Sequence, residues 1–237
     1  MGDSLSVSII IPCRDDYKHL LITLSKISKL YPKPEIIVCD ASKKPSMIKE
    51  ICINYNAKFI KVSSPSRGNQ LDAGAELAGS KILLFHHADT DFSQDHYNSL
   101  MNLFRTQESI IGGAFLKDIG ELYPSLKVFS WLHRLYTTHI GTLYGDQSIF
   151  VLRSVFTEMG GFGDLPLMED VNFSSRLRDY GNVSVITPAI KSSSRKFSID
   201  GKFKRKIKNI GLIFLYRLGV SPDELVKLYY DDKTSGA

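Results

Sequence analysis

The sequence predicts an α/β fold in which a mostly parallel sheet carries helices on both faces. Two observations predict it. Short apolar runs, typical of buried strands, alternate four times with segments of helical periodicity in the first half of the chain. Such strand–helix repeats favour parallel pairing through right-handed crossovers. Polar residues also gather directly after each apolar run, where sheets of this kind bind their ligands.

The first half of the chain contains four expected strands, at residues 7–11, 35–39, 58–62 and 81–85. The helices between and after them are expected at residues 20–31, 45–52, 71–77 and 93–104. Four apolar residues at helical spacing indicate the first helix: Leu20, Leu24, Ile27 and Tyr31. Ser93 is a good cap for the fourth helix.

The second half of the chain has a weaker pattern. Strands are expected at residues 110–116, 148–152 and 183–186, and helices at 170–180 and 222–230, with a broken helical pattern over 122–139. The last helix has the clearest start, because Ser221-Pro222-Asp223-Glu224 supplies a cap, a first-turn proline and a capping-box glutamate. No linker or repeat is visible, so a single domain is expected over residues 1–237, with parts at 5–105, 106–200 and 201–230.

The composition is that of one globular domain, with 237 residues of which 43% are hydrophobic. The three cysteines match no zinc-binding spacing, so buried free thiols and a reducing, cytoplasmic location are expected. No signal peptide is visible, and no apolar run approaches the ~20 residues of a membrane-spanning helix. The net charge of +5 suits an anionic partner, but the basic residues lack the aromatic platform of a nucleic-acid site.

The residues that follow the four strands carry groups suited to a nucleotide and a metal. Asp89 and Asp91 supply the hard oxygen ligands that Mg²⁺ or Mn²⁺ prefers. Asp40 can accept hydrogen bonds from a base or a ribose, and the guanidinium of Arg67 matches phosphate geometry. Each acid alone is equally well explained as a helix cap. Their gathering on one edge of the sheet favours a nucleotide diphosphate, whose charge the metal would neutralise.

Several segments resemble one known family. They are Ile10-Ile11-Pro12-Cys13-Arg14-Asp15-Asp16, Val38-Cys39-Asp40-Ala41-Ser42, Phe85-His86-His87-Ala88-Asp89-Thr90, Gly145-Asp146-Gln147 and Leu167-Met168-Glu169-Asp170. Residues 67–75 are similar to the Arg-x-x-Gln-x-Asn-x-Gly segment of one bacterial branch. The chain thus resembles the family-2 glycosyltransferases over most of its length. The resemblance implies the Rossmann-like GT-A fold of nucleotide-diphospho-sugar transferases, and no motif identifies the sugar.

The resemblance also implies a site. Its nucleotide-sugar-binding residues would be Pro12, Arg14, Asp16, Asp40, Arg67, Gln70, Asp89, Asp146, Gln147 and Arg195. Asp40 falls where the family contacts the base, and Asp89 falls on the second acid of the Asp-x-Asp metal motif. His87 stands where many relatives carry the first acid, so the expected metal ligands are Asp89, Asp91 and His87. Residues 5–105 would then bind the donor, and residues 106–200 the acceptor.

Asp170 is the expected catalytic base, with Glu169 as the second choice. Sugar transfer with inversion needs a carboxylate that takes the proton of the acceptor hydroxyl. The resemblance places Asp170 on the Glu-Asp motif that supplies this base in inverting members. Both acids open a predicted helix, whose N-terminus favours their ionised form. The same position would suit acids that only complement the helix dipole.

The chain also carries a basic stretch with an apolar face, in which the apolar residues are Phe203, Ile207, Ile210, Phe214 and Leu218. Packing of this helix on its own domain is the preferred interpretation. A basic amphipathic helix also suits peripheral contact with the inner face of an anionic membrane, which would make a lipid-like acceptor attractive.

Two other functions fit parts of the sequence. A nucleotidyltransferase usually carries a glycine-rich loop with Lys or Arg directly after the first strand, whereas Asp15 and Asp16 would repel phosphate there. A non-catalytic nucleotide-sugar-binding module is disfavoured by the presence of Asp170. The sequence therefore favours an inverting, metal-dependent glycosyltransferase that takes its sugar from a nucleotide-diphosphate donor.

Overall fold

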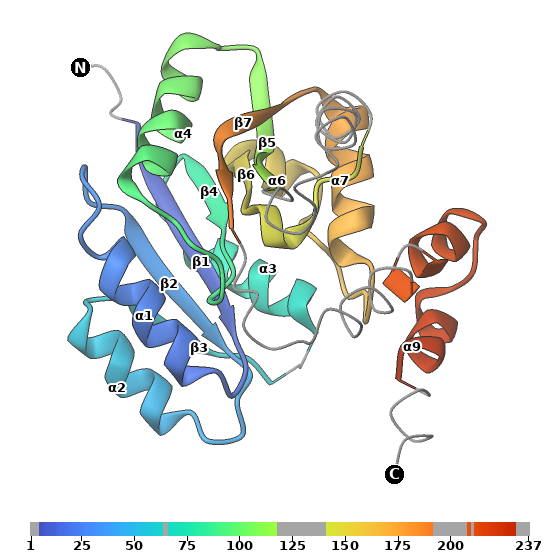
Figure 1. Cartoon of the computed structure of the whole chain (residues 1–237), viewed down its shortest axis with the longest axis horizontal. Coiled ribbons are helices and arrows are strands. Elements are labelled where there is room, and N and C mark those ends of the chain that lie inside the picture. The colour runs from blue at the N-terminus through green and yellow to red at the C-terminus, as the bar shows by residue number, and fades with distance from the viewer. Residues whose placement is uncertain (1–4, 64–65, 118–140, 192–207, 210, 231–237) are drawn as a thin grey trace, which may run out of the picture.

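The computed structural model describes residues 5–63, 66–117, 141–191, 208–209 and 211–230. A single sheet of seven strands forms the centre of the described part, in the order β3-β2-β1-β4-β6-β5-β7 (Figure 1). The strands are β1 (Val7–Cys13), β2 (Glu35–Asp40), β3 (Lys58–Lys61), β4 (Ile82–Phe85), β5 (Ile110–Lys117), β6 (Ile149–Leu152) and β7 (Asn182–Ile190).

The first four strands are parallel, as the alternation of strand and helix predicts. β1 lies between β2 and β4, and β3 extends the sheet beyond β2. The carboxyl ends of β1 and β2 are in register, with Cys13 opposite Asp40. The loops after these strands therefore meet at one edge of the sheet.

The second half of the chain joins the sheet differently. β6 is antiparallel to both β4 and β5, whereas β5 and β7 are parallel. The prediction of a mostly parallel sheet is confirmed, with β6 as the exception. Because β6 runs against β4, the turn that precedes it, η1 (Gly145–Gln147), lies at the carboxyl edge of β4.

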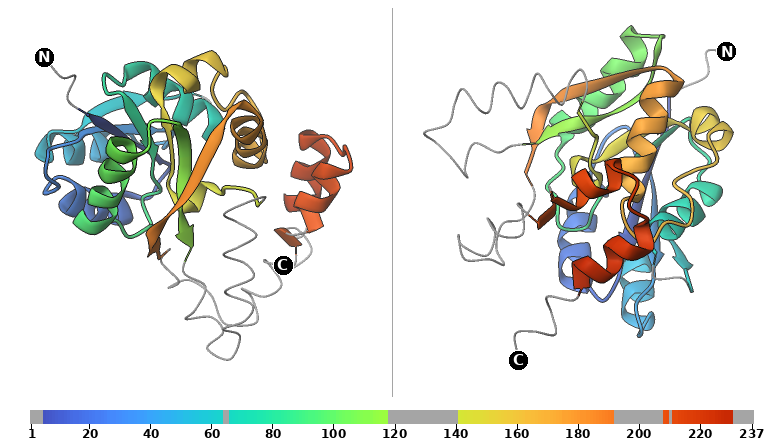
Figure 2. Two further views of the ribbon diagram at one scale, coloured as in Figure 1. Left: turned by 90° about the horizontal axis from the view of Figure 1, so that it is seen from above. Right: turned by 90° about the vertical axis from the view of Figure 1, so that its right-hand side faces the viewer.

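Helices cover both faces of the sheet, as predicted (Figures 1 and 2). The helices on these faces are α1 (Tyr17–Ile27), α2 (Ser46–Asn54), α3 (Arg67–Leu77), α4 (Gln94–Thr106), α6 (Arg153–Glu158) and α7 (Glu169–Tyr180), and α9 (Pro222–Tyr230) lies apart from the sheet (Figure 1). The buried faces of α1, α2 and α4 share one apolar core, while α3, α6 and α7 pack on the other face of the sheet.

The C-terminal residues form a small separate layer beside α7. Helical turns at residues 211–217 and the helix α9 pack through Leu212 and Leu225 against Met168 and Val171. Figure 2 shows this pair standing against the side of α7. The start of α7 is thus covered by these C-terminal helical residues.

Most elements lie where the sequence places them, with three differences. α3 begins at Arg67, four positions before the expected start. Its first turn is polar and packs against backbone, so no apolar pattern marks this turn in the sequence. α1 ends at Ile27, so Tyr31 is not on its buried face and is 80% exposed. The short helix α6 was not expected, and the pattern at 122–139 lies outside the described residues.

No helix among the described residues has the length and apolarity to cross a membrane.

Candidate functional site

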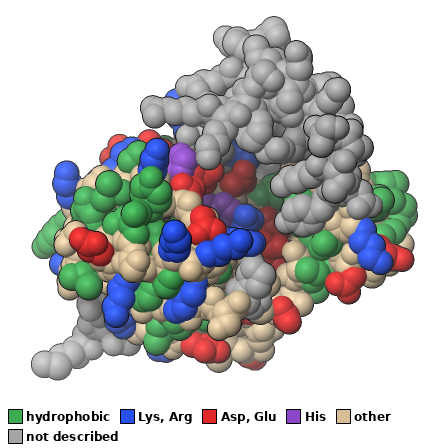
Figure 3. All heavy atoms as spheres, turned by 90° about the horizontal axis from the view of Figure 1, so that it is seen from below, with side chains coloured by type: hydrophobic (Ala, Val, Ile, Leu, Met, Phe, Trp, Pro, Cys, Tyr) green, Lys and Arg blue, Asp and Glu red, His purple; other side chains and the backbone are tan. Residues whose placement is uncertain are grey.

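Charged side chains gather at the carboxyl edge of the sheet. Figure 3 looks onto this edge and shows a hollow in which acidic, basic and histidine side chains meet, while apolar side chains flank it. The loops after β1, β2 and β4, the first turn of α3 and the start of α7 all contribute to this edge. The sites predicted after separate strands therefore belong to one region.

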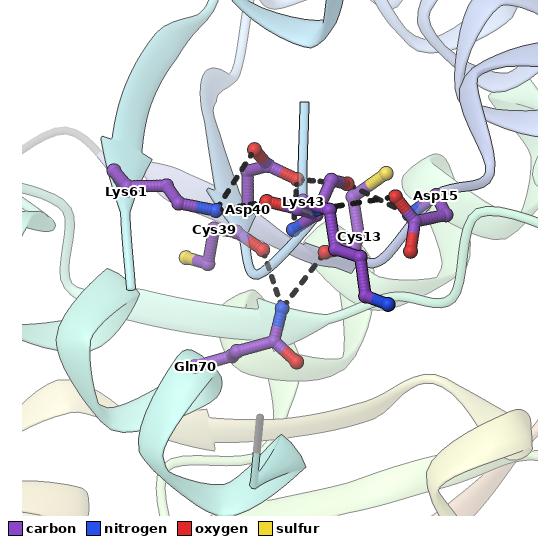
Figure 4. Close-up of polar contacts among 8 residues, drawn as sticks. Cys13, Asp15, Cys39, Asp40, Lys43, Lys61 and Gln70 are labelled. Carbon is purple, nitrogen blue, oxygen red and sulfur yellow. Dashed lines mark hydrogen bonds and ion pairs between the residues drawn. The ribbon is translucent and has the colours of Figure 1, made fainter. Parts of the chain in front are cut away.

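Asp40 ends β2 and is completely buried. Its Oδ1 accepts hydrogen bonds from the backbone N–H of Ser42, at 2.9 Å, and from the Ser42 hydroxyl. The ammonium of Lys61 lies 3.7 Å from Oδ2, which accepts no hydrogen bond and is shielded from solvent (Figure 4). A buried carboxylate oxygen with an unused lone pair is suited to a ligand that donates a hydrogen bond.

Gln70 connects the ends of β1 and β2. From the first turn of α3 its Nε2 donates to the carbonyl of Cys13, at 2.9 Å, and to that of Cys39, at 2.7 Å (Figure 4). Both of its N–H groups are used in this way, so the contribution of Gln70 is to hold the strand ends together. We call Asp40, Ser42, Lys61 and Gln70 the donor edge.

The loop after β1 borders the donor edge. The backbone N–H of Asp15 donates to the Ser42 hydroxyl at 2.7 Å, and Asp15 adopts a left-handed φ of 54°. Asp16 precedes α1 and contacts the ring of His19 at 2.6 Å. Pro12 is half-buried at the end of β1, whereas Arg14 is exposed. Arg14 is thus accessible to a ligand, whereas Asp15 and Asp16 make contacts with other residues of the protein.

The side chains of the loop after β4, which include the predicted metal ligands, differ in exposure and in their partners. His86 is buried and pairs through Nδ1 with the Ser148 hydroxyl at 2.8 Å, and burial lowers its pKa to about 4. Asp89 is exposed. Asp91 is half exposed and forms a 2.5 Å ion pair with Lys26 in the last turn of α1. The carboxylate of Asp91 is therefore occupied by Lys26, whereas that of Asp89 is accessible.

His87 lies beside the start of α7. A Cβ added at Gly145 would be 3.0 Å from Nε2 of His87 and 3.5 Å from Oδ2 of Asp170, so only glycine fits between them without displacement. Nε2 is buried and has no hydrogen-bond partner. Burial, reinforced by the charge of Arg67, holds the pKa of His87 well below 6.5. The ring is therefore neutral at neutral pH.

Glu169 and Asp170 begin α7 after Met168, which adopts a left-handed φ of 67°. Asp170 accepts the N–H of Gly145 at Oδ2 and that of Val171 at Oδ1, each at 2.8 Å. Burial raises the pKa of Asp170, although these two N–H groups and the charge of Arg67 oppose the shift. A left-handed residue directly before two adjacent acids, one buried and one partly buried, is a local strain of the kind found at functional sites.

Glu169 is buried, and its charged neighbour is Arg67 in the first turn of α3. Nη1 of Arg67 lies 3.6 Å from Oε1 of Glu169, and the Arg67 side chain is half exposed. Burial, followed by the charge of Asp170, raises the pKa of Glu169, while Arg67 lowers it. The long, partly exposed contact leaves Arg67 able to reach another anion.

Asp146 and Gln147 occupy η1 on the other side of Gly145. Asp146 forms an ion pair with Lys117 at the end of β5, and its Oδ1 is buried without a hydrogen-bond partner. Gln147 is buried and donates to the carbonyl of Phe115 at 3.0 Å, so its amide supports the sheet. We call His87, Asp146, Glu169 and Asp170 the base cluster.

The described residues include no group of three or more His, Cys, Asp or Glu side chains placed to hold a metal ion. His87, Asp89 and Asp91 are thus not assembled as a complete set of ligands. Arg195, the remaining predicted contact, lies outside the described residues.

Three further residues at the site were not predicted from the sequence: Lys117, Gly145 and Asp72. Gly145 belongs to the Gly-Asp-Gln motif, so attention to that motif would have found it. Lys117 reaches Asp146 across 29 positions, and Asp72 reaches the backbone of Phe162 across 90. Asp72 belongs to the segment 67–75 that carries the resemblance, whereas nothing in the local sequence around Lys117 signals its contact.

Comparison with known families gives one match. The model of the family described as glycosyl transferase family 2 matches residues 8–154, which include the donor edge and all of η1 and β6. The sequences of curated proteins give no match.

Solved structures with low sequence identity share the fold. The mannosyltransferase PcManGT from Pyrobaculum calidifontis, in complex with GDP-Man and Mn²⁺, has a TM-score of 0.70 at 17% identity, over 97% of this chain and 70% of that one. Residues 1–349 of TarS from S. aureus, in complex with UDP, have a TM-score of 0.64 at 18% identity, over 79% and 60%.

A third similar structure is glucosyl-3-phosphoglycerate synthase from Mycobacterium tuberculosis, in complex with Mn²⁺, UDP and glucosyl-3-phosphoglycerate. Its TM-score is 0.60 at 16% identity, over 92% of this chain and 81% of that one. What these three structures share with this chain is the arrangement of the sheet and helices.

Proposed function

Because this chain belongs to glycosyl transferase family 2 and has the GT-A fold, we propose that it transfers a sugar from a nucleotide-diphosphate donor to an acceptor hydroxyl. The donor binds along the donor edge, with its diphosphate near Arg67 and the loop after β4. The acceptor reaches the sugar from the side of the base cluster. The reaction proceeds with inversion and uses Mg²⁺ or Mn²⁺.

One observation carries the proposal: among the described residues, the buried side-chain polar atoms without a hydrogen-bond partner gather at this edge. Two of them, Nε2 of His86 and Oγ1 of Thr90, follow β4. The other three are Oδ2 of Asp40, Nε2 of His87 and Oδ1 of Asp146. A buried polar atom without a partner costs free energy, so such atoms are rare unless a ligand completes them. The three atoms lie in the donor edge and in the base cluster, which is the span that a nucleotide sugar and its acceptor would cover.

The donor edge suits the nucleoside. Oδ2 of Asp40 can accept a hydrogen bond from a base N–H or a ribose hydroxyl, with Lys61 at 3.7 Å to hold the charge. Arg67 suits the diphosphate, because its guanidinium is half exposed and its present partner, Glu169, is 3.6 Å away. Gln70 maintains the spacing of the two strand ends on which Asp40 and the Asp15 loop sit.

A divalent ion fits His87 and Asp89. The ring of His87 is neutral, which is the form that coordinates metals, and its Nε2 has no protein partner. Asp89 offers an exposed carboxylate two residues later. Oxygen atoms of the diphosphate would complete the coordination, as is usual for Mg²⁺. The ion would neutralise charge on the leaving diphosphate. Asp91, held by Lys26, is not needed.

Asp170 is the base in this proposal. As the acceptor oxygen bonds to the anomeric carbon and the bond to the diphosphate breaks, the hydroxyl proton passes to the Asp170 carboxylate. The N–H groups of Gly145 and Val171 fix the orientation of both carboxylate oxygens. Burial raises the pKa of Asp170, which strengthens its carboxylate as a base.

Contact with a membrane stays a prediction. Of the apolar face expected around residues 203–218, Phe214 and Leu218 are described, and they are 62% and 67% exposed. A lipid-like acceptor is consistent with such a surface. Co-sedimentation with anionic vesicles at low salt tests it, and an absence of binding would reject it.

The proposal is tested by incubating the protein with a panel of UDP-, GDP- and dTDP-sugars and Mn²⁺, and measuring released nucleoside diphosphate. Release or transfer is expected for one nucleotide class, with loss of turnover on chelation of the metal. A non-catalytic binding module would bind one nucleotide, detected by a thermal shift, without release from any donor. Binding of no nucleotide, with or without Mn²⁺, would contradict both functions.

A further inference from the structure

Asp72 lies on α3, between the donor edge and the segment that leads into the base cluster. Its Oδ1 accepts the backbone N–H of Phe162 at 2.8 Å, and its Oδ2 accepts the backbone N–H of Gly163 at 3.0 Å. Both oxygens of one carboxylate are thus used on consecutive amides. Asp72 borders the site but belongs to neither the donor edge nor the base cluster.

The segment that Asp72 binds, residues 160–164, has a backbone shaped for an anion. Gly160, Gly161 and Gly163 have φ values of 75°, 69° and 80°, a conformation that other residues rarely adopt. A Cβ at Gly161 would be 2.5 Å from Oδ1 of Asp72, so the carboxylate also fills the space above this glycine. Consecutive N–H groups turned to one side in this way form an anion-binding concavity.

The N-cap and first turn of α3 make three more contacts with this segment and with Leu165, which follows it. A Cβ at Gly68 would be 2.5 Å from the carbonyl oxygen of Gly163, so the helix backbone touches the segment directly. The Asn69 amide donates to Asp164 at 2.7 Å, and the Ser66 hydroxyl donates to the carbonyl of Leu165 at 3.2 Å. The helix that carries Arg67 and Gln70 is therefore fastened along residues 162–165.

α7 holds the segment from the other side. The Arg176 guanidinium donates to the carbonyls of Met159, at 2.8 Å, and Gly161, at 2.6 Å. The ring of Phe162 packs between those of Phe85 and Phe173, with centroids 4.9 and 4.4 Å away. The segment is thus a rigid spacer between α3 and α7, and it ends four residues before Met168.

We infer that Asp72 is a positioning residue for the transfer step. By fixing the segment 160–164, Asp72 holds the start of α7 at a set distance from the first turn of α3. Glu169 and Asp170 lie at that start, and Arg67 lies in that first turn. The inference rests on the proposed function, because it assigns Asp72 an effect on the base and not on the donor. Burial raises the pKa of Asp72 although two N–H groups oppose it, so the carboxylate is retained at a cost in stability.

The test is Asp72→Asn, which keeps the shape but turns an amide NH₂ toward one of the two backbone N–H groups. We expect kcat to fall about tenfold to a hundredfold, since a small displacement of a catalytic group has effects of that size. The dissociation constant for the nucleoside diphosphate should change less than about twofold, because the donor edge is untouched. Glu76→Gln, an exposed acid on the same helix, is the matched control and should change neither quantity.

A role in folding alone predicts a different pattern, in which donor affinity and kcat fall together with the melting temperature. An unchanged kcat, or equal losses in kcat and donor affinity, would overturn the inference. Asn69→Ala provides a milder second variant, for which a smaller loss of kcat in the same direction is expected.

Hydrogen exchange separates this inference from the proposed function. In Asp72→Asn the backbone amides of residues 160–170 should exchange faster than in the unaltered protein, while those of β1 and β2 should not. This arm needs no turnover, so a protein without transferase activity still tests the positioning contact. Unchanged exchange at residues 160–170 would overturn the role of Asp72.

Discussion

The donor edge and the base cluster use their polar groups in different ways. At the donor edge, Gln70 is fully engaged with two carbonyls, and the Ser42 N–H and hydroxyl satisfy one oxygen of Asp40. In the base cluster, the buried Glu169 and the partly buried Asp170 are adjacent acids whose pKa values are both raised. The first region is stabilised by its contacts, whereas the second contains charges that burial penalises.

The difference separates binding from chemistry. A rigid edge that leaves one buried acceptor open, Oδ2 of Asp40, suits recognition, because little ordering is needed when a ligand arrives. An acid whose pKa is raised by burial suits proton transfer, because that pKa lies closer to the pH at which the protein works. Variants of the two regions should therefore fail in distinguishable ways.

Asp170→Asn should have the largest effect. It removes the proton acceptor, and a general base contributes about 10²–10⁴-fold to turnover, so we expect kcat to fall by that factor. Nucleoside diphosphate binding, measured by calorimetry, should stay within about threefold of the unaltered protein, because the donor edge is unchanged. Asp179→Asn, an exposed acid in the last turn of the same helix, is the control.

The pH profile sharpens this prediction. Burial raises the pKa of Asp170 above its usual 3.8, so the loss of turnover on acidification should begin at a higher pH than for an ordinary aspartate. Retained turnover in Asp170→Asn would transfer the role of base to another residue. Loss of nucleotide binding along with turnover would remove the proposed separation between the two regions.

Asp40→Asn should affect the other region. Asn keeps an oxygen for Ser42 but removes the charge that Oδ2 offers to a ligand beside Lys61. Because a hydrogen bond to a charged group contributes about 1.5–3 kcal/mol, donor affinity should fall roughly tenfold to a hundredfold. kcat at saturating donor should remain near that of the unaltered protein.

Glu50→Gln, an exposed acid on α2, serves as the control for this variant. A fall in kcat with unchanged donor affinity would place Asp40 in the chemistry and break the comparison. The measurement is a titration of the nucleoside diphosphate, with and without Mn²⁺, alongside steady-state kinetics.

Gly74→Ala tests the rigidity of the donor edge. The added Cβ would be 2.5 Å from Cγ2 of Ile10 and 2.6 Å from Sγ of Cys39, so α3 must move away from β1 and β2. Overpacking of this kind costs about 1–3 kcal/mol, which corresponds to a fall in Tm of roughly 2–12 °C for a chain of this size. Gly79→Ala, whose Cβ would meet nothing closer than 3.9 Å, should change Tm far less.

The sequence predicted the donor edge better than the base cluster. Strands β1 to β4 each appear as an apolar run, and parallel strands place the residues after them on one edge by geometry alone. The strand pattern alone therefore brings Asp40 and Arg67 to the same edge. What the pattern missed was the buried polar turn at Arg67–Gln70, because its partners are backbone carbonyls and not apolar side chains.

The base cluster depends on contacts that no local pattern encodes. β6 enters the sheet antiparallel between β4 and β5, which carries Gly145 and Asp146 to the side of His87. The resemblance to a family supplied Asp170, but its two N–H donors and the ion pair of Asp146 with Lys117 follow from that tertiary arrangement. Likewise, Asp91 is a plausible ligand in the sequence, and its pairing with Lys26 is visible only in the structure.

Glu169→Gln should have the smallest effect on turnover and stability. This variant distinguishes the role of Glu169 from that of Asp170. The folded-state pKa of Glu169 is raised above 4.5, so the folded protein binds this proton more tightly than the unfolded chain. Its contribution to stability is present below the unfolded pKa and is lost as pH rises through the folded pKa. The ionised side chain therefore costs stability at neutral pH, and Gln should raise Tm there by about 1–3 °C.

The gain in Tm should disappear near pH 4, where the native Glu169 is protonated, and the lost contact with half-exposed Arg67 should subtract little. Because Asp170 accepts the proton in the proposed mechanism, kcat of Glu169→Gln should stay within about tenfold of the unaltered value, against the 10²–10⁴-fold expected for loss of the base. Scanning calorimetry at the two pH values and steady-state kinetics measure both quantities. A lower Tm at neutral pH would show that Arg67 outweighs burial, and a kcat as low as that of Asp170→Asn would mean that the two acids act as one base.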